Sequence, residues 1–310
     1  MQSGIERRRH RPSLPLRPAT FWFQRSPLRE ATQMACEPDL IFDVGSHKGE
    51  DMDFYLKKGF KVVAFEANPE LIAYCQVRFG DAIADGRLRI VEGAIAPEAA
   101  GERIVFYKNV QVSVWGTIDA TWAERNRMLG TQSVRVEVER VDILRAFRTY
   151  GIPLYLKIDI EGADHVVLDG LRQLEGRPRY ISIEAEKVDF ARLVAELSAL
   201  RDLGYQSFKP VQQARISGTR IATETIRGDP LDHVFEDNAS GPFGDDLPGP
   251  WSSYEECMRQ YCRIFTLYRL FGDYSTLRGL PGGRRSIGLL ERLLRQPLPG
   301  WYDTHAKLGQ

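Results

Sequence analysis

The chain has 310 residues, which is enough for one large α/β domain with a smaller unit appended to it. Lysine plus arginine and aspartate plus glutamate number 42 each, so no net charge draws the protein toward nucleic acid or an anionic membrane. Its four cysteines form no CxxC pair, and no apolar run approaches the ~18 residues of a membrane helix. We therefore expect a cytoplasmic protein whose partner is a small molecule, with no nucleic acid and no membrane.

The first 35 residues are rich in arginine and proline and have no helical or strand periodicity. We predict a disordered basic arm over residues 1–35. Three interpretations stay open: a solvated tail, a segment that precedes a true start at Met34, and a contact with nucleic acid or lipid.

Short apolar runs that alternate with amphipathic segments begin at Asp39, which predicts a parallel sheet with crossover helices. The first strand is expected over 40–44, followed by a helix over 50–58 and a second strand over 61–65. Pro69 stands at the favoured first turn of the next helix. These segments form one βαβ unit.

The later segments continue this pattern. Further parallel strands are expected over 88–92, 154–160, 180–185 and 205–208, with a helix over 188–203. Strict alternation over 104–107 and 134–138 predicts an antiparallel excursion, and 233–236 is expected to supply a seventh, antiparallel strand. The expected fold class is α/β: a Rossmann-like, mostly parallel seven-stranded sheet with helices on both faces and a C-terminal helical appendage.

A stretch of turn-forming residues, 238–250, separates two regions of the chain. We assign residues 36–240 to the sheet domain and residues 241–310 to a C-terminal helical extension. Within the extension, 252–271 and 284–295 carry apolar and aromatic residues at helical spacing. Such stripes more often pack on the parent domain than bind a partner, although a non-catalytic adaptor remains an alternative.

Residues 43–49, directly after the first strand, are Asp-Val-Gly-Ser-His-Lys-Gly. Glycine is needed where the backbone approaches a ligand, because a Cβ would collide there. Alone, this spacing is equally consistent with an ordinary tight turn. The second strand ends at Glu66, where a carboxylate can accept hydrogen bonds from both hydroxyls of a ribose. The alternative is that Glu66 caps the helix at Pro69.

Two cofactor classes use this geometry and differ in what the turn must hold. A dinucleotide needs Gly-x-Gly-x-x-Gly and a bare helix N-terminus for its pyrophosphate. This chain has His47 and Glu50 where the later glycines would stand. S-adenosyl-L-methionine has no phosphate, and its sulfonium cation tolerates Glu50 and favours Asp43 nearby. The turn therefore favours S-adenosyl-L-methionine, with an NAD(P)-linked oxidoreductase as the alternative on the same fold.

Three short blocks carry a resemblance to a known family. They are Asp-Val-Gly-x-x-x-Gly at 43–49, Ala-Phe-Glu-x-x-Pro at 64–69 and Leu-Lys-Ile-Asp-Ile-Glu-Gly at 156–162. These blocks resemble the signature of the FkbM-type family of class I S-adenosylmethionine-dependent methyltransferases. The resemblance implies O-methylation of a hydroxyl on a sugar or polyketide-like natural product.

The resemblance also implies cofactor-binding positions. These are Asp43, Gly45, Ser46 and Gly49 on the methionine and ribose side, Glu66 on the ribose, and Glu92, Gly93 and Ala94 near the adenine. Ser46 and His47 depart from the commoner Ala-Asn of the first block, which bears on the fine geometry of that turn.

The third block ends a central strand, where open α/β sheets bind their ligands. Methyl transfer requires an aligned acceptor that loses its proton. Asp159 and Glu161 would share a face if extended geometry persists, and we assign both as catalytic, one as base or acceptor anchor. Equally open is a structural role, in which Glu161 caps the next helix and Asp159 bonds the cofactor loop.

Other ionisable residues receive structural assignments. Lys157, inside a buried strand, is expected to pair with Glu184 or Glu186. His165 and His233 lie near the expected pocket, but neither is assigned as the general base. We expect no obligatory metal, because no fixed metal-ligand spacing occurs.

The methyl acceptor is expected to contact the loop over 110–132, which carries Trp115 and Trp122. Excursions near strand ends tend to line pockets. Oxygen and nitrogen both stay open as the atom that is methylated.

Overall fold

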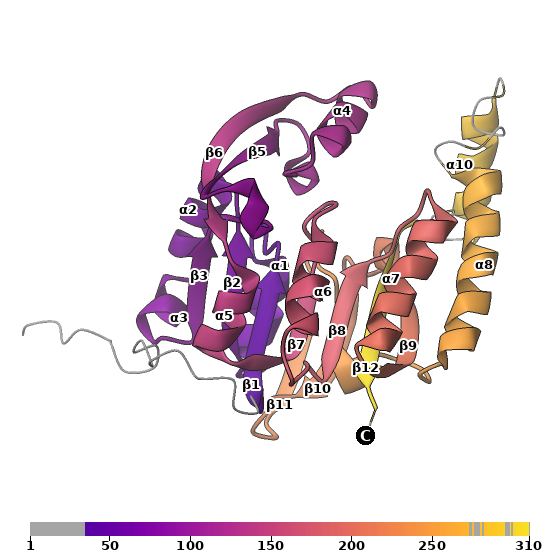
Figure 1. Ribbon diagram of the computed structural model, residues 1–310. Helices are drawn as coiled ribbons and strands as arrows, with labels where there is room; N and C mark the ends of the chain where they lie inside the picture. The colour runs from indigo at the N-terminus through magenta and orange to yellow at the C-terminus, as the bar shows by residue number, and fades with distance from the viewer. Residues whose placement is uncertain are drawn as a thin grey trace, which may run out of the picture.

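The computed structural model describes residues 35–272, 275, 280, 282–294, 298 and 300–309. Residues 1–34 of the predicted basic arm, which include Met34, lie outside the described residues. Among these residues a seven-stranded sheet forms the centre, with helices on both faces (Figure 1).

The strands of the central sheet confirm the predicted α/β class. In spatial order they are β3 (Leu88–Glu92), β2 (Lys61–Glu66), β1 (Cys36–Val44), β7 (Ile152–Ile158), β8 (Tyr180–Glu184), β12 (Tyr302–Leu308) and β9 (Tyr205–Gln212). Neighbouring strands from β3 to β8 run parallel, and β12 is antiparallel to both β8 and β9. The sheet is therefore mostly parallel, as expected.

The identity of the seventh strand differs from the prediction. Residues 233–236 were expected to supply it, but β10 (Arg220–Glu224) and β11 (Pro230–Val234) form a separate antiparallel hairpin. The seventh strand is β12, which lies inside the predicted helical extension. Its residues Asp303, Thr304 and His305 are at most 8% exposed, so the strand lacks the apolar alternation by which sequence reasoning recognises strands.

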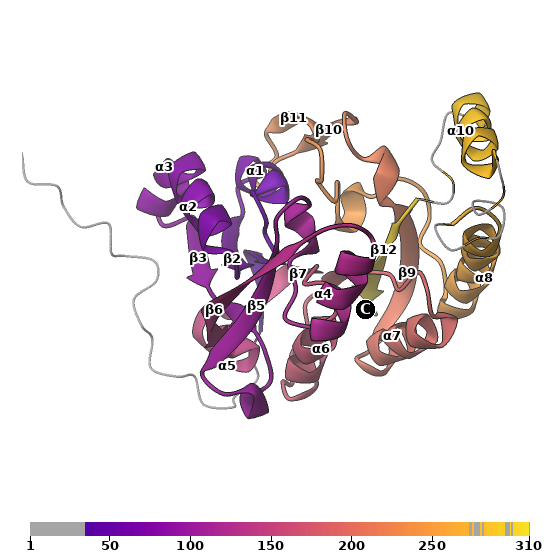
Figure 2. The same cartoon turned by 90° about the horizontal axis from the view of Figure 1, so that it is seen from above.

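Seven described helices cover the sheet or its edges. They are α1 (Glu50–Lys57), α2 (Pro69–Arg78), α3 (Gly80–Ala84), α5 (Ile143–Tyr150), α6 (Asp164–Arg172), α7 (Phe190–Asp202) and α8 (Tyr254–Phe271). A further helix, α10 (Gly283–Leu294), lies farther from the sheet (Figures 1 and 2). Along β1, Phe42 and Val44 face a core shared with α5, α6, α7 and α8, whereas Ile41 faces a core shared with α1. This alternation places helices on both faces.

The helical part of the C-terminal extension is confirmed by α8 and α10. One side of α8 is buried, and its Tyr261 hydroxyl lies 2.5 Å from the Thr304 hydroxyl of β12. The aromatic stripe of α8 therefore packs on the parent sheet. The division of the chain after residue 240 stays a prediction.

The predicted antiparallel excursion is confirmed. Strands β5 (Arg103–Asn109) and β6 (Ser133–Val141) pair with Ile104 opposite Val138. Between them lie a 3₁₀ turn, η2 (Ser113–Trp115), and a helix, α4 (Ala120–Met128). A two-residue strand, β4 (Ala94–Ile95), pairs with β6 and joins the excursion to the sheet. Figures 1 and 2 show this excursion, residues 103–141, above the ends of the central strands; we call it the overhang.

Candidate active site

The site lies where the order of strands reverses. From β1 the chain continues outward to β2 and β3 on one side, and β7 and β8 lie on the other. Strand β1 ends beside β7, with Val44 opposite Ile158. Ligands of open α/β sheets bind outside the carboxyl ends of the strands at such a switch point. The turn after β1, residues 45–49, and the turn after β7, residues 159–163, therefore form the floor of the site; we call the first the cofactor turn.

Gly45 brings these two turns into contact. Its φ is +85°, and a Cβ built on it would lie 1.8 Å from the carbonyl oxygen of Asp159. The backbone N–H groups of Gly45 and Ser46 donate to the Phe65 carbonyl at 3.0 and 3.1 Å, which ties the cofactor turn to β2. Only a residue without a side chain permits this approach.

Glu66 ends β2 with its carboxylate in a pocket. Its Oε2 accepts a hydrogen bond from the His47 backbone N–H at 2.9 Å, and its Oε1 accepts one from that of Asn68 at 2.8 Å. Burial raises the pKa of Glu66, and these N–H groups oppose the increase. Each oxygen keeps lone-pair capacity for a ligand hydroxyl. The helix-capping alternative is wrong, because the Asn68 side chain caps α2.

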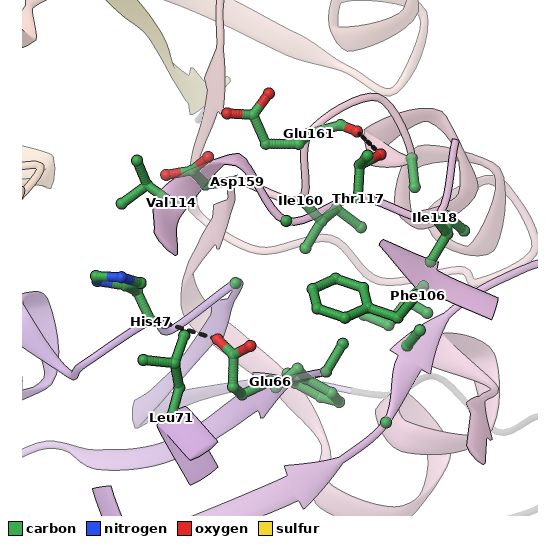
Figure 3. Close-up of a pocket in the computed structure, with 18 of the residues that line it drawn as sticks. His47, Glu66, Leu71, Phe106, Val114, Thr117, Ile118, Asp159, Ile160 and Glu161 are labelled. Atoms are coloured by element: carbon green, nitrogen blue, oxygen red, sulfur yellow. Dashed lines mark hydrogen bonds between the residues drawn. The ribbon is translucent and has the colours of Figure 1, made fainter. Parts of the chain in front are cut away.

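The pocket has a volume of about 670 Å³, with the solvent at its mouth included. In Figure 3, Phe106 and Ile118 of the overhang lie at one end, His47 and Asp159 lie at the other, and Glu66 lies between them. An apolar end, a carboxylate and a polar end match the adenine, the ribose and the charged methionine of S-adenosylmethionine. The residues present therefore fit that cofactor.

The predicted site residues divide into two groups. Those that line the pocket are Gly45, Glu66, Gly93, Ala94, Asp159 and Glu161. Those outside its lining are Asp43, Ser46, Gly49 and Glu92. Asp43 at the end of β1 and Ser46 within the cofactor turn are both buried, and Gly49 precedes α1 with φ +78°. The carboxylate of Glu92 is exposed and accepts a hydrogen bond from Gln76 at 2.9 Å. The individual roles stay predictions.

A buried charge cluster underlies both turns. The Nζ atom of Lys157 lies 3.6 Å from carboxylate oxygens of Asp43 and Asp51, and 3.5 Å from one of Asp159. Burial raises the pKa of Asp43 to about 7, and Lys157 opposes this increase. Burial by itself would lower the pKa of Lys157, but the neighbouring carboxylates hold it well above its usual value. The cluster therefore keeps an ammonium charge beneath the site.

The prediction that Lys157 pairs with Glu184 or Glu186 is wrong. Glu184 is bonded to Lys187 at 2.9 Å, and Glu186 accepts a hydrogen bond from the backbone N–H of Val188. Glu184 ends β8 and Glu186 lies just after it, on one side of β7. The ammonium group of Lys157 instead lies beside Asp43 of β1 and Asp51 of α1, on the other side.

Replacing Lys157 by methionine leaves Asp43 and Asp51 buried without a counter-charge. We expect Lys157→Met to lower the free energy of unfolding by about 3–5 kcal/mol, measured by urea denaturation. Lys61→Met is the matched control, because the Lys61–Asp39 pair is 37% and 39% exposed. Exposed pairs contribute at most about 1 kcal/mol. Equal losses in the two variants would contradict a structural role for the buried cluster.

The turn after β7 departs from the predicted extended geometry. Strand β7 ends before Asp159, and Glu161 has φ +46°, so the two acids do not alternate along one strand. The Thr117 hydroxyl donates to the Glu161 carbonyl at 2.7 Å, which fixes this turn against the overhang (Figure 3). Burial, together with nearby Glu184 and Asp159, raises the pKa of Glu161 well above its usual value. The capping alternative for Glu161 is wrong, because no side chain caps α6.

Sequence reasoning did not assign His47 or Ser113 to the site. The His47 ring lies 2.8 Å from Glu50 Oε1 and 2.8 Å from Ser113 Oγ. The departure of His47 from the commoner asparagine was the available signal, whereas nothing in the sequence pairs it with the overhang. His233 is buried against Phe54 of α1 and lies outside the pocket.

A second, larger pocket lies between α6, α7 and α4, with an empty volume of about 1320 Å³ that includes solvent. Trp122 lines it and packs on Gly162, where an added Cβ would lie 2.8 Å from the indole nitrogen. His165 lines this pocket too, whereas Trp115 lines neither pocket. The two pockets meet at the turn after β7, since each takes residues from it.

Among the described residues, no three or more His, Cys, Asp or Glu side chains are grouped so that they could hold a metal ion. Within the same part of the chain, every helix is too short or too polar to cross a membrane.

A family model described as Methyltransferase FkbM domain matches residues 43–207, just over half of the chain. No curated protein matches. Similar solved structures include a precorrin-6Y C5,15-methyltransferase from Geobacter metallireducens, with 15% identity and a TM-score of 0.31 over 67% of this chain and 78% of that one. Another is a SAM-dependent methyltransferase from Archaeoglobus fulgidus, with 12% identity and a TM-score of 0.34 over 87% of this chain and 86% of that one. Identities this low say nothing about the substrate of this chain.

Proposed function

The chain belongs to the FkbM methyltransferase family and is an S-adenosylmethionine-dependent methyltransferase; we propose that it methylates a hydroxyl group of a sugar or another natural-product small molecule. The observation that carries the proposal is the polar end of the pocket, where His47 and Asp159 lie beyond the carboxylate of Glu66. A hydroxyl must lose a proton when it is methylated, and these ionisable groups lie where its methyl group would arrive.

Binding of the cofactor is assigned to both walls of the pocket. Glu66 accepts hydrogen bonds from the ribose hydroxyls, and Gly93, Ala94 and Phe106 line the part of the pocket that takes the adenine. Gly45 lets the methionine part approach the backbone. The overhang excludes water from the reacting atoms, because Thr117 holds it to the turn after β7.

Transfer needs alignment more than covalent catalysis. When bound, S-adenosylmethionine would supply a methyl carbon on a cationic sulfur. The acceptor oxygen would bond to that carbon as the carbon–sulfur bond breaks, with its electron pair remaining on sulfur. Asp159 and Glu161 anchor the acceptor from the turn after β7. The second pocket, with Trp122 on its wall, accommodates the rest of the acceptor.

Thermal unfolding of the full chain with four ligands tests the cofactor site. S-adenosylmethionine and S-adenosylhomocysteine, at about 100 times their dissociation constants, are expected to add about 2.7 kcal/mol and raise the midpoint by several degrees. NAD and NADP are expected to leave it unchanged, because Glu50 lies where a pyrophosphate would approach. A shift with NAD or NADP alone would overturn the site assignment.

Transfer of a tritiated methyl group to a panel of sugars, phenols and amines tests the acceptor. Label on hydroxyl compounds, with base-stable ether products, is the expected result. Label on amines alone would contradict the proposed O-methylation and leave the cofactor site intact.

A further inference from the structure

His47 connects the cofactor turn to the overhang. Its backbone N–H donates to Glu66, and its ring bridges Glu50 on α1 and Ser113 in η2, at 2.8 Å on each side. The residue has φ +50°, a conformation that a non-glycine residue holds only when its surroundings stabilise it. Its side chain is 13% exposed and lines the polar end of the pocket. The chain therefore holds this ring in one orientation at the place where methyl transfer is proposed.

The partners of the ring fix which nitrogen carries the proton. Burial alone would raise the pKa of Glu50, but hydrogen bonds from His47 and from the Lys48 backbone hold it below its usual value. Glu50 is thus an ionised acceptor, and Nδ1 donates to it. In the neutral ring Nε2 then carries the free lone pair. That lone pair faces the Ser113 hydroxyl, so its present partner is already an alcohol.

We propose that His47 is the general base of the reaction: Nε2 accepts the proton of the acceptor hydroxyl, and Glu50 positions the ring and stabilises the imidazolium that forms. The inference rests on the proposed O-methylation. As the acceptor oxygen bonds to the methyl carbon, the electron pair of its O–H bond stays on oxygen and the proton moves to Nε2. Solvent then takes the proton from the ring, which restores the neutral base.

The geometry favours His47 over the two acids. Asp159 is 44% exposed, and its carboxylate is already paired with the Lys157 ammonium group at 3.5 Å. Glu161 lies on the turn and is the rival base. Among the three side chains, and within the described residues, only the His47 ring has a hydroxyl group at hydrogen-bond distance, with Nε2 2.8 Å from Ser113 Oγ, which suits proton transfer.

The tautomer is tested without any acceptor. Long-range ¹H–¹⁵N correlation spectra of the ¹⁵N-labelled full chain with S-adenosylhomocysteine show which ring nitrogen is protonated, and His47→Asn assigns the signals. A proton on Nδ1 and a bare Nε2 is the expected result, with the preference lost in Glu50→Gln. A proton on Nε2 in the wild-type protein would overturn the proposal.

The rate is tested with the best hydroxyl compound of the labelled panel. His47→Asn is expected to lower kcat by about 100-fold or more while the affinity for S-adenosylhomocysteine changes by about threefold at most. The acidic limb of the pH–rate profile is expected to disappear in this variant. The other titratable groups facing the ring or its backbone are Glu50 on α1, Glu66 on β2, Cys75 on α2 and Asp159 after β7.

Two further variants separate the outcomes. Glu70→Gln is the control for Glu50→Gln, because Glu70 is an exposed acid in the first turn of α2 that pairs with Lys108; it should match the wild type. Loss of the acidic limb in Glu161→Gln, with the limb kept in His47→Asn, would overturn the proposal and assign the base to Glu161. Failure of the wild-type enzyme to label any hydroxyl is a failure of the proposed O-methylation instead.

Discussion

Gly45→Ala is expected to weaken binding of S-adenosylhomocysteine by about 100-fold. The alanine Cβ would lie 1.8 Å from the Asp159 carbonyl oxygen, so the cofactor turn or the end of β7 must move. The backbone N–H of Gly45 is hydrogen-bonded to the carbonyl of Phe65, the residue before Glu66. Movement of the turn is therefore expected to displace the ribose-binding carboxylate as well. A misplacement of about 1 Å in an active site lowers the reaction rate by about 100-fold, and we expect a loss of similar size in cofactor affinity. Isothermal titration calorimetry of the full chain measures the loss.

Gly101→Ala is the matched control for this variant. Gly101 has φ +86°, nearly the value of Gly45, but a Cβ there meets no atom within 4 Å. A positive φ costs a non-glycine residue about 1–3 kcal/mol, so both variants are expected to lose stability. Only Gly45→Ala should also lose affinity. Wild-type affinity in a folded Gly45→Ala protein would mean that the close approach of the two turns is not needed for the cofactor.

The first βαβ unit was predictable because its signals are local. The apolar run of β1, the glycine turn, Pro69 and Glu66 lie within one short stretch, and each has a physical meaning without knowledge of the rest of the chain. The structure places Gly45 and Glu66 in one pocket, as that local geometry requires.

Strand order explains what the sequence did not reveal. Lys157 lies between β1 and β8 in space, and the sequence does not say which neighbour its long side chain reaches. His47 and Ser113 are separated by 66 positions and meet only because the overhang folds over the cofactor turn. Such pairings depend on how loops fold in three dimensions, for which periodicity carries no signal.

Strand β12 was missed for a different reason. Burial, together with nearby Asp159 and Glu184, raises the pKa of Asp303 well above the usual value, although Lys157 opposes the increase. Strand β12 lies between β8 and β9 with Asp303 and the polar side chains next to it buried. Sequence reasoning assigns strands by apolar alternation, so a strand whose buried residues are ionisable or hydroxylated escapes it. Departures of this kind concentrate near functional sites.

Glu66→Ala is expected to weaken binding of S-adenosylhomocysteine by about 100- to 10,000-fold. Hydrogen bonds to a charged group contribute about 1.5–3 kcal/mol each, and the carboxylate is positioned for two ribose hydroxyls. Every 1.4 kcal/mol is about tenfold in affinity. The variant also leaves the backbone N–H groups of His47 and Asn68 without their acceptor, so Glu66→Gln, which keeps one oxygen, is expected to bind with intermediate affinity.

Glu92→Ala tests where the adenine binds: in the pocket, or beside Glu92 as the family resemblance implies. Glu92 lies opposite Glu66 in the register of β2 and β3, but its carboxylate is exposed, bonded to Gln76 and outside the pocket lining. If the adenine lies against Gly93, Ala94 and Phe106, Glu92→Ala should bind S-adenosylhomocysteine as the wild type does. A loss of affinity equal to that of Glu66→Ala would mean that the adenine lies beside Glu92 at the end of β3 and not in the pocket beneath the overhang. Titration of both variants under one set of conditions therefore distinguishes the two positions, because the two acids are register partners on neighbouring strands and only Glu66 lines the pocket.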